Sequence, residues 1–224
     1  TIAFLIRECA AATSRSDGLL PSHRDRLTDL VDRLSDPATL NQLLDALEDT
    51  QLKPPQPDLV GLFGQLSPGA LHPMLSHLVR SRNGELRAIL EDAVTRLASS
   101  NTVELMALIG SEDESVSLEA MRRAGDLRSP AAVAPLARIL ESPSETSRAA
   151  AVAALAQIAS PGAMQALERG LDDSDRDIRL AVVKAFAERQ YRPVIAHLER
   201  AIKEHLLRDG SSAEKTAFFD AYAT

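Results

Sequence analysis

The side chains that could do chemistry are few, and their spacing matches no catalytic or metal-binding pattern. The single cysteine is Cys9, and the histidines are His23, His72, His77, His197 and His205. No two histidines have the i, i+4 spacing with an intervening glutamate that a zinc protease helix uses, and Cys9 has no motif typical of a nucleophile beside it. The sequence also has no phosphate-binding glycine loop and no G-x-S-x-G motif. We therefore predict no catalytic residue, no metal site and no cofactor.

A cluster of acidic side chains precedes one predicted helix, and it consists of Asp172, Asp173, Asp175 and Asp177. Such a cluster could hold a cation or accept protons. However, Arg176 and Arg179 lie among the acids, and the glycine of a calcium-binding loop is missing. Acidic residues at a helix start also interact favourably with the helix dipole. We therefore predict that these residues cap a helix and form a salt-bridged turn.

The composition indicates an all-α protein in a reducing compartment. Of 224 residues, 45% are hydrophobic, only 3% are aromatic, and none is tryptophan, which favours helices packed on helices. One cysteine excludes an intramolecular disulfide, so we expect a cytoplasmic protein. The apolar run near the N-terminus is interrupted by Arg7 and Glu8 and is too short for a membrane span.

A period of 31 residues organises most of the chain. The segments "SPGALHPMLSHL", "SPAAVAPLARIL" and "SPGAMQALERGL" begin at Ser67, Ser129 and Ser160. Steps of 31 residues connect twelve apolar positions in two columns: Leu43, Met74, Leu105, Leu136, Leu167 and Leu198, and Leu47, Leu78, Ile109, Leu140, Leu171 and Ile202. A fixed period of this length predicts an array of repeats.

Each repeat unit should contain two helices, because a further apolar column runs through its second half: Leu59, Leu90, Met121, Val152 and Val183. The predicted units are 36–66, 67–97, 98–128, 129–159 and 160–190, with a sixth from 191. We expect Ser67, Ser129 and Ser160 to be N-caps, each followed by a proline at the first helical position. Pro73 and Pro135 should bend the first helices that contain them.

The predicted domains are an N-terminal helical cap or degenerate repeat at 1–35 and a repeat array at 36–224. In the sixth unit the polar segment "KEHLLRDGSS" breaks the period, so its second helix should begin near Ser212. The segment "KPPQP" at 53–57 should be a loop inside the first repeat. Because the chain starts with Thr1 and stops inside a helical pattern, we expect a fragment that is truncated at its C-terminus.

The segment "LDDSDRDIRLAVVKAFAE" at 171–188 resembles HEAT repeats, especially the short variety of bilin-lyase-like proteins, and the resemblance covers about 36–208. The family implies a right-handed α-solenoid, here of about six two-helix repeats, that binds other proteins along the concave face formed by its second helices. In this family a turn aspartate and a second-helix arginine join neighbouring repeats, and Asp173, Arg179 and Arg148 match those positions. The pattern is incomplete, because Ser142 replaces an aspartate and Ser117 and Leu86 replace arginines.

The best candidate for a functional site is a surface on the second helices. The positions that the apolar columns leave facing outward, and that we predict to bind protein, are Glu119, Arg122, Arg123, Ala150, Ala153, Ala154, Gln157, Lys184 and Glu188. Small side chains in the middle would admit a partner helix or extended peptide, and the cations would contact its carboxylates. Alternatively, the alanines only form a helix that packs closely on its neighbour.

Three functions remain open. The first is a noncatalytic scaffold or adaptor that binds a protein partner, or another domain of its own chain, through the second-helix face. The second is a nucleic-acid-binding HEAT-like protein, which a net charge of −7 and the shortage of aromatic residues disfavour. The third is a bilin-lyase-like accessory subunit, which is implied by the resemblance alone.

Overall fold

The computed structural model describes residues 29, 31–49, 54–203 and 212–223. The chain divides into two compact units, 1–108 and 109–224, and each is described by itself. Every described element is helical and no described residue lies in a strand, so the predicted all-α class is confirmed. Most of the predicted N-terminal cap and Cys9 lie outside the described residues, although 29 and 31–35 are helical.

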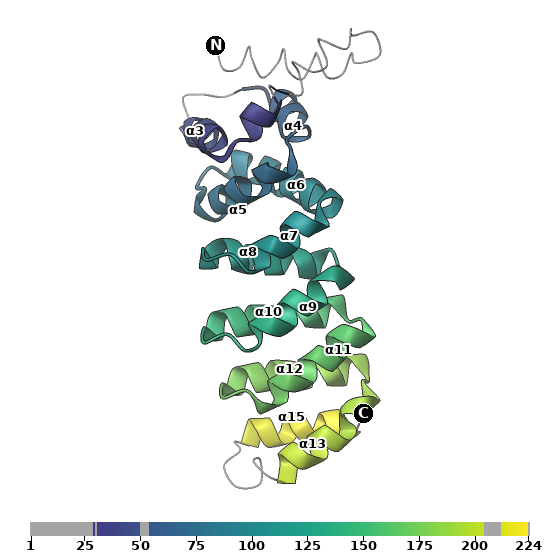
Figure 1. Cartoon of the computed structure of the whole chain (residues 1–224). Helices are drawn as coiled ribbons and strands as arrows, with labels where there is room; N and C mark the ends of the chain where they lie inside the picture. Colours follow the sequence, from purple (N-terminus) through teal and green to yellow (C-terminus); the bar gives the residue numbers. More distant parts are fainter. Residues whose placement is uncertain (1–28, 30, 50–53, 204–211, 224) are drawn as a thin grey trace. The chain divides into compact units, whose positions relative to one another are not determined.

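The first unit contains two complete helix pairs (Figure 1). Its elements are α3 (Pro37–Glu48), α4 (Gln56–Phe63), η2 (Pro68–Ala70), α5 (Leu71–Arg80) and α6 (Gly84–Ser100), followed by α7 (Thr102–Ile109), which ends at the division between the units. First helix packs on first helix, α3 against α5, and second on second, α4 against α6. The prolines at 54 and 55 lie between the helices of the first pair, as predicted, but Gln56 and Pro57 of the predicted loop already belong to α4, and residue 53 lies outside the described residues.

The second unit repeats this arrangement (Figure 1). Its elements are α8 (Glu114–Asp126), η3 (Pro130–Ala132), α9 (Val133–Ile139), α10 (Glu145–Ile158), α11 (Pro161–Leu167), η4 (Glu168–Asp172), α12 (Arg176–Arg189), η5 (Arg192–Val194), α13 (Ile195–Ala201) and α15 (Ser212–Ala223). The second helices α8, α10, α12 and α15 pack in that order, and the first helices α9 and α11 pack side by side. The two-helix units and the start of the last helix at Ser212 are therefore as predicted.

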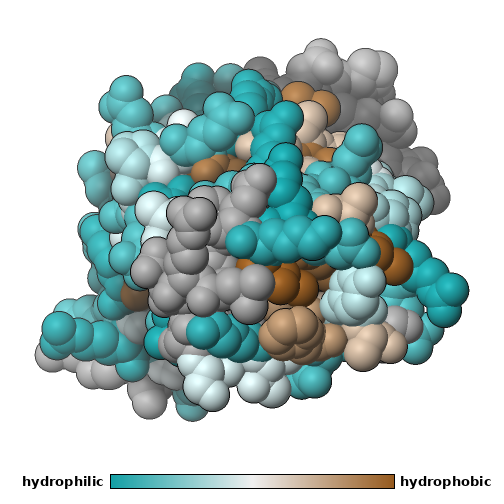
Figure 2. Space-filling view, turned by 90° about the horizontal axis from the view of Figure 1, so that it is seen from below, coloured by the Kyte–Doolittle hydropathy of each residue, from teal (hydrophilic) through white to brown (hydrophobic). Residues whose placement is uncertain are grey.

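The periodic apolar columns form the core of both units. Eleven of the twelve positions in the two first-helix columns are buried, and Ile202 is half-buried. All five positions of the second-helix column are buried as well. In the described part of the second unit, the large exposed apolar side chains are Phe219 and Tyr222, both on α15. Viewed from the side of α13 and α15, the surface is mostly hydrophilic with hydrophobic areas among it (Figure 2).

The helix starts agree only in part with the prediction. Ser160 accepts a hydrogen bond from the backbone N–H of Ala163, but the side chains of Ser67 and Ser129 make no capping bond. Pro73 and Pro135 have no N–H for an α-helix continuing from the preceding turn, although η5 (Arg192–Val194) forms the same turn before α13 with His197 at the equivalent position. The chain instead forms the 3₁₀ turns η2 and η3, and each proline becomes the third residue of a new α-helix. The predicted bend of the first helix is thus a break between a 3₁₀ turn and a separate α-helix.

The second helices begin with side-chain caps that recur at the repeat period. Asp113, Ser144 and Asp175, spaced by 31 residues, each accept hydrogen bonds from backbone N–H groups of the first helical turn. The predicted capping role of the acidic cluster is therefore confirmed at Asp175.

The second helices of the second unit also end at a repeated position. Arg128, Ala159 and Gln190 have φ values of 48°, 50° and 51°. This left-handed conformation reverses the chain after the helix. The backbone N–H of the residue after Arg128, and of the residue after Gln190, donates to the carbonyl oxygen five residues earlier in the chain. Glycine usually occupies such positions, because any side chain costs about 1 kcal/mol there.

We predict that Ala159→Gly stabilises the protein by about 0.5–1 kcal/mol, because glycine removes the strain of positive φ. The matched control is Ala153→Gly in the exposed interior of α10, which should destabilise by about 0.5–1 kcal/mol. Urea unfolding followed by circular dichroism gives both values. Destabilisation of the same size in the two variants would contradict the assigned helix end.

We also predict that Leu136→Ala or Leu167→Ala lowers the free energy of unfolding by about 2–5 kcal/mol, because both side chains are fully buried. Val103, which is 83% exposed, provides the control, since Val103→Ala should change stability by less than about 0.5 kcal/mol. Equal effects at buried and exposed sites in denaturant titrations would show that the repeat register is wrong.

Candidate interaction surface

The second helices of the second unit expose equivalent positions one above the next. We define the second-helix stripe as Ser115, Arg122 and Asp126 of α8, Thr146, Ala149, Ala153 and Gln157 of α10, and Asp177, Ala181, Lys184 and Glu188 of α12, all of which are exposed. Three of its rows follow the 31-residue period completely. The middle row consists of Arg122, Ala153 and Lys184.

Five of the nine predicted binding residues lie on this stripe, and they are Arg122, Ala153, Gln157, Lys184 and Glu188. Glu119 and Ala150 are partly exposed at its edge. The prediction missed the row Ser115, Thr146 and Asp177, which stepping by 31 residues from any one of them would have revealed.

Arg123 and Ala154 do not face solvent, so this part of the prediction is wrong. Successive helical residues are about 100° apart, so exposure of Arg122 turns Arg123 toward the interior. The Arg123 side chain is only 4% exposed, and its Nε donates to Glu119 Oε1 at 2.9 Å. Ala154 packs against Gly125 of α8, where a Cβ atom on the glycine would lie 3.0 Å from Ala154 Cα. At Ala154 the alternative interpretation, close helix packing, is correct.

The charges of the stripe are paired with one another. Arg122 binds Glu119 and also Asp126, the latter at 2.8 Å, and Lys184 Nζ lies 3.8 Å from Glu188 Oε1. Burial opposes ionisation of Glu119, but hydrogen bonds from Arg122 and Arg123 outweigh it and hold the pKa of this carboxyl below its ordinary value. At the α8 end of the stripe, the charge of Arg122 is therefore already paired with nearby carboxylates. The Lys184–Glu188 pair has a longer N–O distance and is largely exposed.

A largely buried ion pair joins α10 to the turn that precedes α12. Arg148 of α10 donates to both oxygens of Asp173, from Nε at 2.8 Å and from Nη2 at 3.0 Å. Arg148 also donates to the carbonyls of Ser142 and Pro143, and Arg179 donates to those of Asp173 and Ser174. The joining role that the resemblance implied is thus present for Arg148 and Asp173, whereas the two carbonyls that Arg179 bonds belong to its own repeat.

The ion pair changes the acidity of Asp173. Burial raises the pKa of this carboxyl, but the bonds from Arg148 and from the Asp175 backbone N–H outweigh burial, and the net pKa is lowered. A depressed carboxyl pKa contributes stability above its unfolded value, and the contribution disappears as pH falls through the folded value.

No group of three or more histidine, cysteine or acidic residues that could hold a metal ion occurs among the described residues. His23 and His205 lie outside them, His72 is exposed, and His197 is engaged with Asp172 at 3.2 Å. None of the described helices is both long and apolar enough to cross a membrane.

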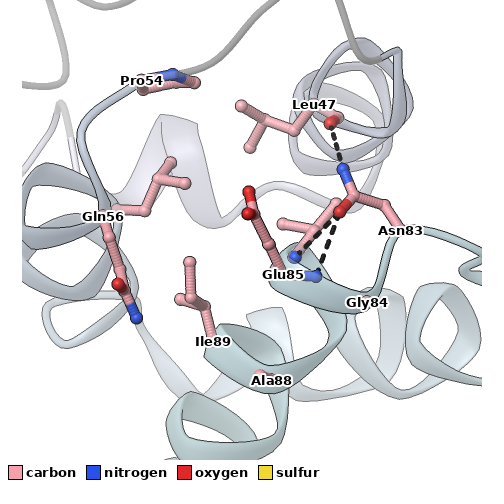
Figure 3. A pocket seen from close by; sticks show the side chains of 10 residues that line it. Leu47, Pro54, Gln56, Asn83, Gly84, Glu85, Ala88 and Ile89 are labelled. Carbon is pink, nitrogen blue, oxygen red and sulfur yellow. Dashed lines mark hydrogen bonds between the residues drawn. The ribbon is translucent and has the colours of Figure 1, made fainter.

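A cleft of about 560 Å³ lies between α3, α4 and α6 in the first unit (Figure 3). Its walls are mainly apolar, from Leu47, Leu59 and Ile89, and Figure 3 shows the Glu85 carboxylate pointing into it. The Asn83 side chain in this cleft is already occupied, because its oxygen caps α6 and its nitrogen donates to the Leu47 carbonyl. The cleft therefore has the character of a gap between packed helices.

Comparison with known proteins identifies the repeat. A family model for HEAT repeats matches residues 133–209. Residues 133–209 are thus recognised as HEAT repeats. The match contains the Arg148–Asp173 pair and helices α10 and α12. The chain is similar to the crystal structure of an engineered protein, with 19% identity over 86% of this chain and 95% of that chain and a TM-score of 0.48. No curated protein matches the chain.

We predict that Asp173→Ala lowers stability by about three times as much as Glu141→Ala. Asp173→Ala leaves the Arg148 guanidinium without its carboxylate in a largely buried place, whereas Glu141 and Arg169 join the same two repeats as an exposed pair. Denaturant midpoints of the two variants provide the comparison. The deficit of Asp173→Ala should also shrink below about pH 4, where protonation removes the pair from the parent; a deficit independent of pH would contradict the ionic origin.

Proposed function

We propose that this chain is a noncatalytic HEAT-repeat scaffold that binds a protein partner, or another domain of its own chain, through the second-helix stripe. The observation that carries the proposal is the repeated exposure of equivalent positions on α8, α10 and α12, because HEAT arrays bind along surfaces that successive repeats build together.

The shape of the stripe supports an elongated occupant. Ala149 and Ala153 leave the middle of the stripe low, and the long side chains of Arg122 and Lys184 stand on the helices to either side. A helix or extended peptide with small or apolar side chains would fit over the alanines, and its polar groups would reach the flanking rows.

The charges favour Lys184 as the main electrostatic contact with a partner. Arg122 is already bound by two carboxylates, and Arg123 is buried. Lys184 keeps a 78% exposed side chain and, within the described part of the chain, forms one long ion pair, with Glu188. A partner carboxylate can therefore approach Lys184 without separating a tight ion pair.

The function is tested with Ala153→Arg, which should prevent partner binding and leave the fold intact. Ala153 is exposed, and arginine is a good helix former, so the substitution obstructs the low middle of the stripe at little cost in stability. The matched control is Ala196→Arg, at an exposed alanine of the first helix α13.

The measurement is affinity capture with the parent chain and both variants, followed by mass spectrometry of the retained proteins. We expect a partner that the parent and Ala196→Arg retain and that Ala153→Arg loses, with unchanged circular dichroism. Equal retention by all three chains would move the binding site away from the stripe.

A further inference from the structure

The second helix of the first repeat, α4, starts late. Pro54 and Pro55 are equivalent, at a step of 31 residues, to Glu85 and Leu86 in the first turn of α6. Neither proline is helical, and Pro55 has an extended backbone with a ψ of 133°. A proline disfavours the helical conformation of the residue before it, which here is Pro54. Helix α4 therefore lacks a turn that α6, α8, α10 and α12 have.

The cleft of about 560 Å³ between α3, α4 and α6 lies beside this missing turn, and Pro54 is one of its walls. We call it the α4 cleft. Its deeper walls are the buried side chains of Leu59 and Ile89, and exposed residues such as Gln56 and Ala88 form its edge. The volume lies within the range of ligand sites in proteins. The α4 cleft is thus a consequence of the prolines in the sequence.

Glu85 supplies the charge of the α4 cleft. Its carboxylate and the Ile89 side chain point into the same space (Figure 3). Glu85 is exposed, and within the described part of the chain its carboxylate makes no ion pair or hydrogen bond. The described residues that line the cleft include no lysine, arginine or histidine. A cation that enters the cleft would therefore meet a carboxylate that has no partner to give up.

The neighbouring polar groups do not compensate this charge. The Asn83 amide is used by the N–H groups of α6 and by the Leu47 carbonyl. On α6 itself, the cation closest in sequence is Arg87, two residues after Glu85. Two helical steps turn a side chain by about 200°, so Arg87 is directed away from the cleft. The α4 cleft therefore combines apolar walls with one negative charge.

We propose that the α4 cleft binds a lysine side chain, together with apolar residues beside it, in a segment of a partner protein. The ammonium group contacts the Glu85 carboxylate, and the flexible hydrocarbon stem lies against Pro54 and Ile89. Because Gln56 and Ala88 at the edge are exposed, a chain that lies across the cleft can reach it. This site belongs to the first unit and does not depend on the second-helix stripe.

Two peptides that differ by one ammonium group test the proposal. The probes are acetyl-Leu-Lys-Leu-amide and acetyl-Leu-norleucine-Leu-amide, since norleucine has the lysine stem without the charge. Each is titrated into the full chain, and NMR of labelled isoleucine and leucine methyl groups follows Leu59 and Ile89. We expect both residues to respond, and the lysine peptide to bind at least about threefold more tightly, which is the effect of one largely exposed ion pair.

Three variants at exposed positions of α6 assign the contact. Glu85→Gln should make the two peptides bind equally, because it removes the charge and keeps the shape. Asp92→Asn is the matched control, since Asp92 is an exposed acid of the same helix outside the described lining, and it should preserve the preference for lysine. Ala88→Arg should prevent binding of the lysine peptide, because it places a long cation at the edge of the cleft.

Circular dichroism should show the same helicity in all three variants, because none of them changes a buried side chain. Equal affinity of the parent for the two peptides would overturn the proposal, since the carboxylate would then select nothing. Unchanged resonances of Leu59 and Ile89, or a preference for lysine that survives in Glu85→Gln, would overturn it as well.

Discussion

The structure depends on the burial of one apolar layer between consecutive helix pairs. A single pair of short helices cannot cover both of its faces, so each repeat buries its columns only when the next repeat packs on it. The required closeness is visible between α8 and α10, where Gly125 lies against Ala154 without room for a further carbon. Leu136 and Leu167, in the same column of successive repeats, are completely buried for this reason.

The apolar period predicted the helix pairs correctly because burial acts directly on residue type. Positions that face the next repeat must be apolar, so the 31-residue apolar columns can be recognised in the sequence. The helix starts were predicted less well, because a 3₁₀ turn follows Ser67 and Ser129 and the two serines make no capping bond. The exposed surface was predicted least well, because one step along a helix separates exposed Arg122 from buried Arg123, and small residues such as Ala153 and Ala154 look alike in either environment.

Polar contacts join neighbouring repeats at several places, and the residues that make them differ from repeat to repeat. In each case a carboxylate of one repeat accepts a hydrogen bond from the neighbouring repeat. The donor is a backbone N–H, a capping hydroxyl or an arginine side chain. Glu48 accepts backbone N–H groups before α6, Glu114 accepts from the Ser144 hydroxyl that caps α10, and Asp173 accepts from Arg148. These acids do not share a register position, so the 31-residue period could not reveal them. Only the Asp173 pair follows the pattern implied by the family resemblance.

If the chain is a scaffold as proposed, the pairing of charges on the second-helix stripe bears on how it selects partners. Arg122 is held by Glu119 and Asp126, so a partner that binds there must displace an existing contact and gains little from charge alone. Lys184 carries a weaker pair, and the alanines between these two residues offer shape without charge. Specificity on such a stripe would come from the fit over Ala149 and Ala153, because only an occupant narrow enough to enter the low middle can also reach Lys184. Electrostatic attraction would then orient the partner, whereas the depth of the stripe would decide which segments are accepted.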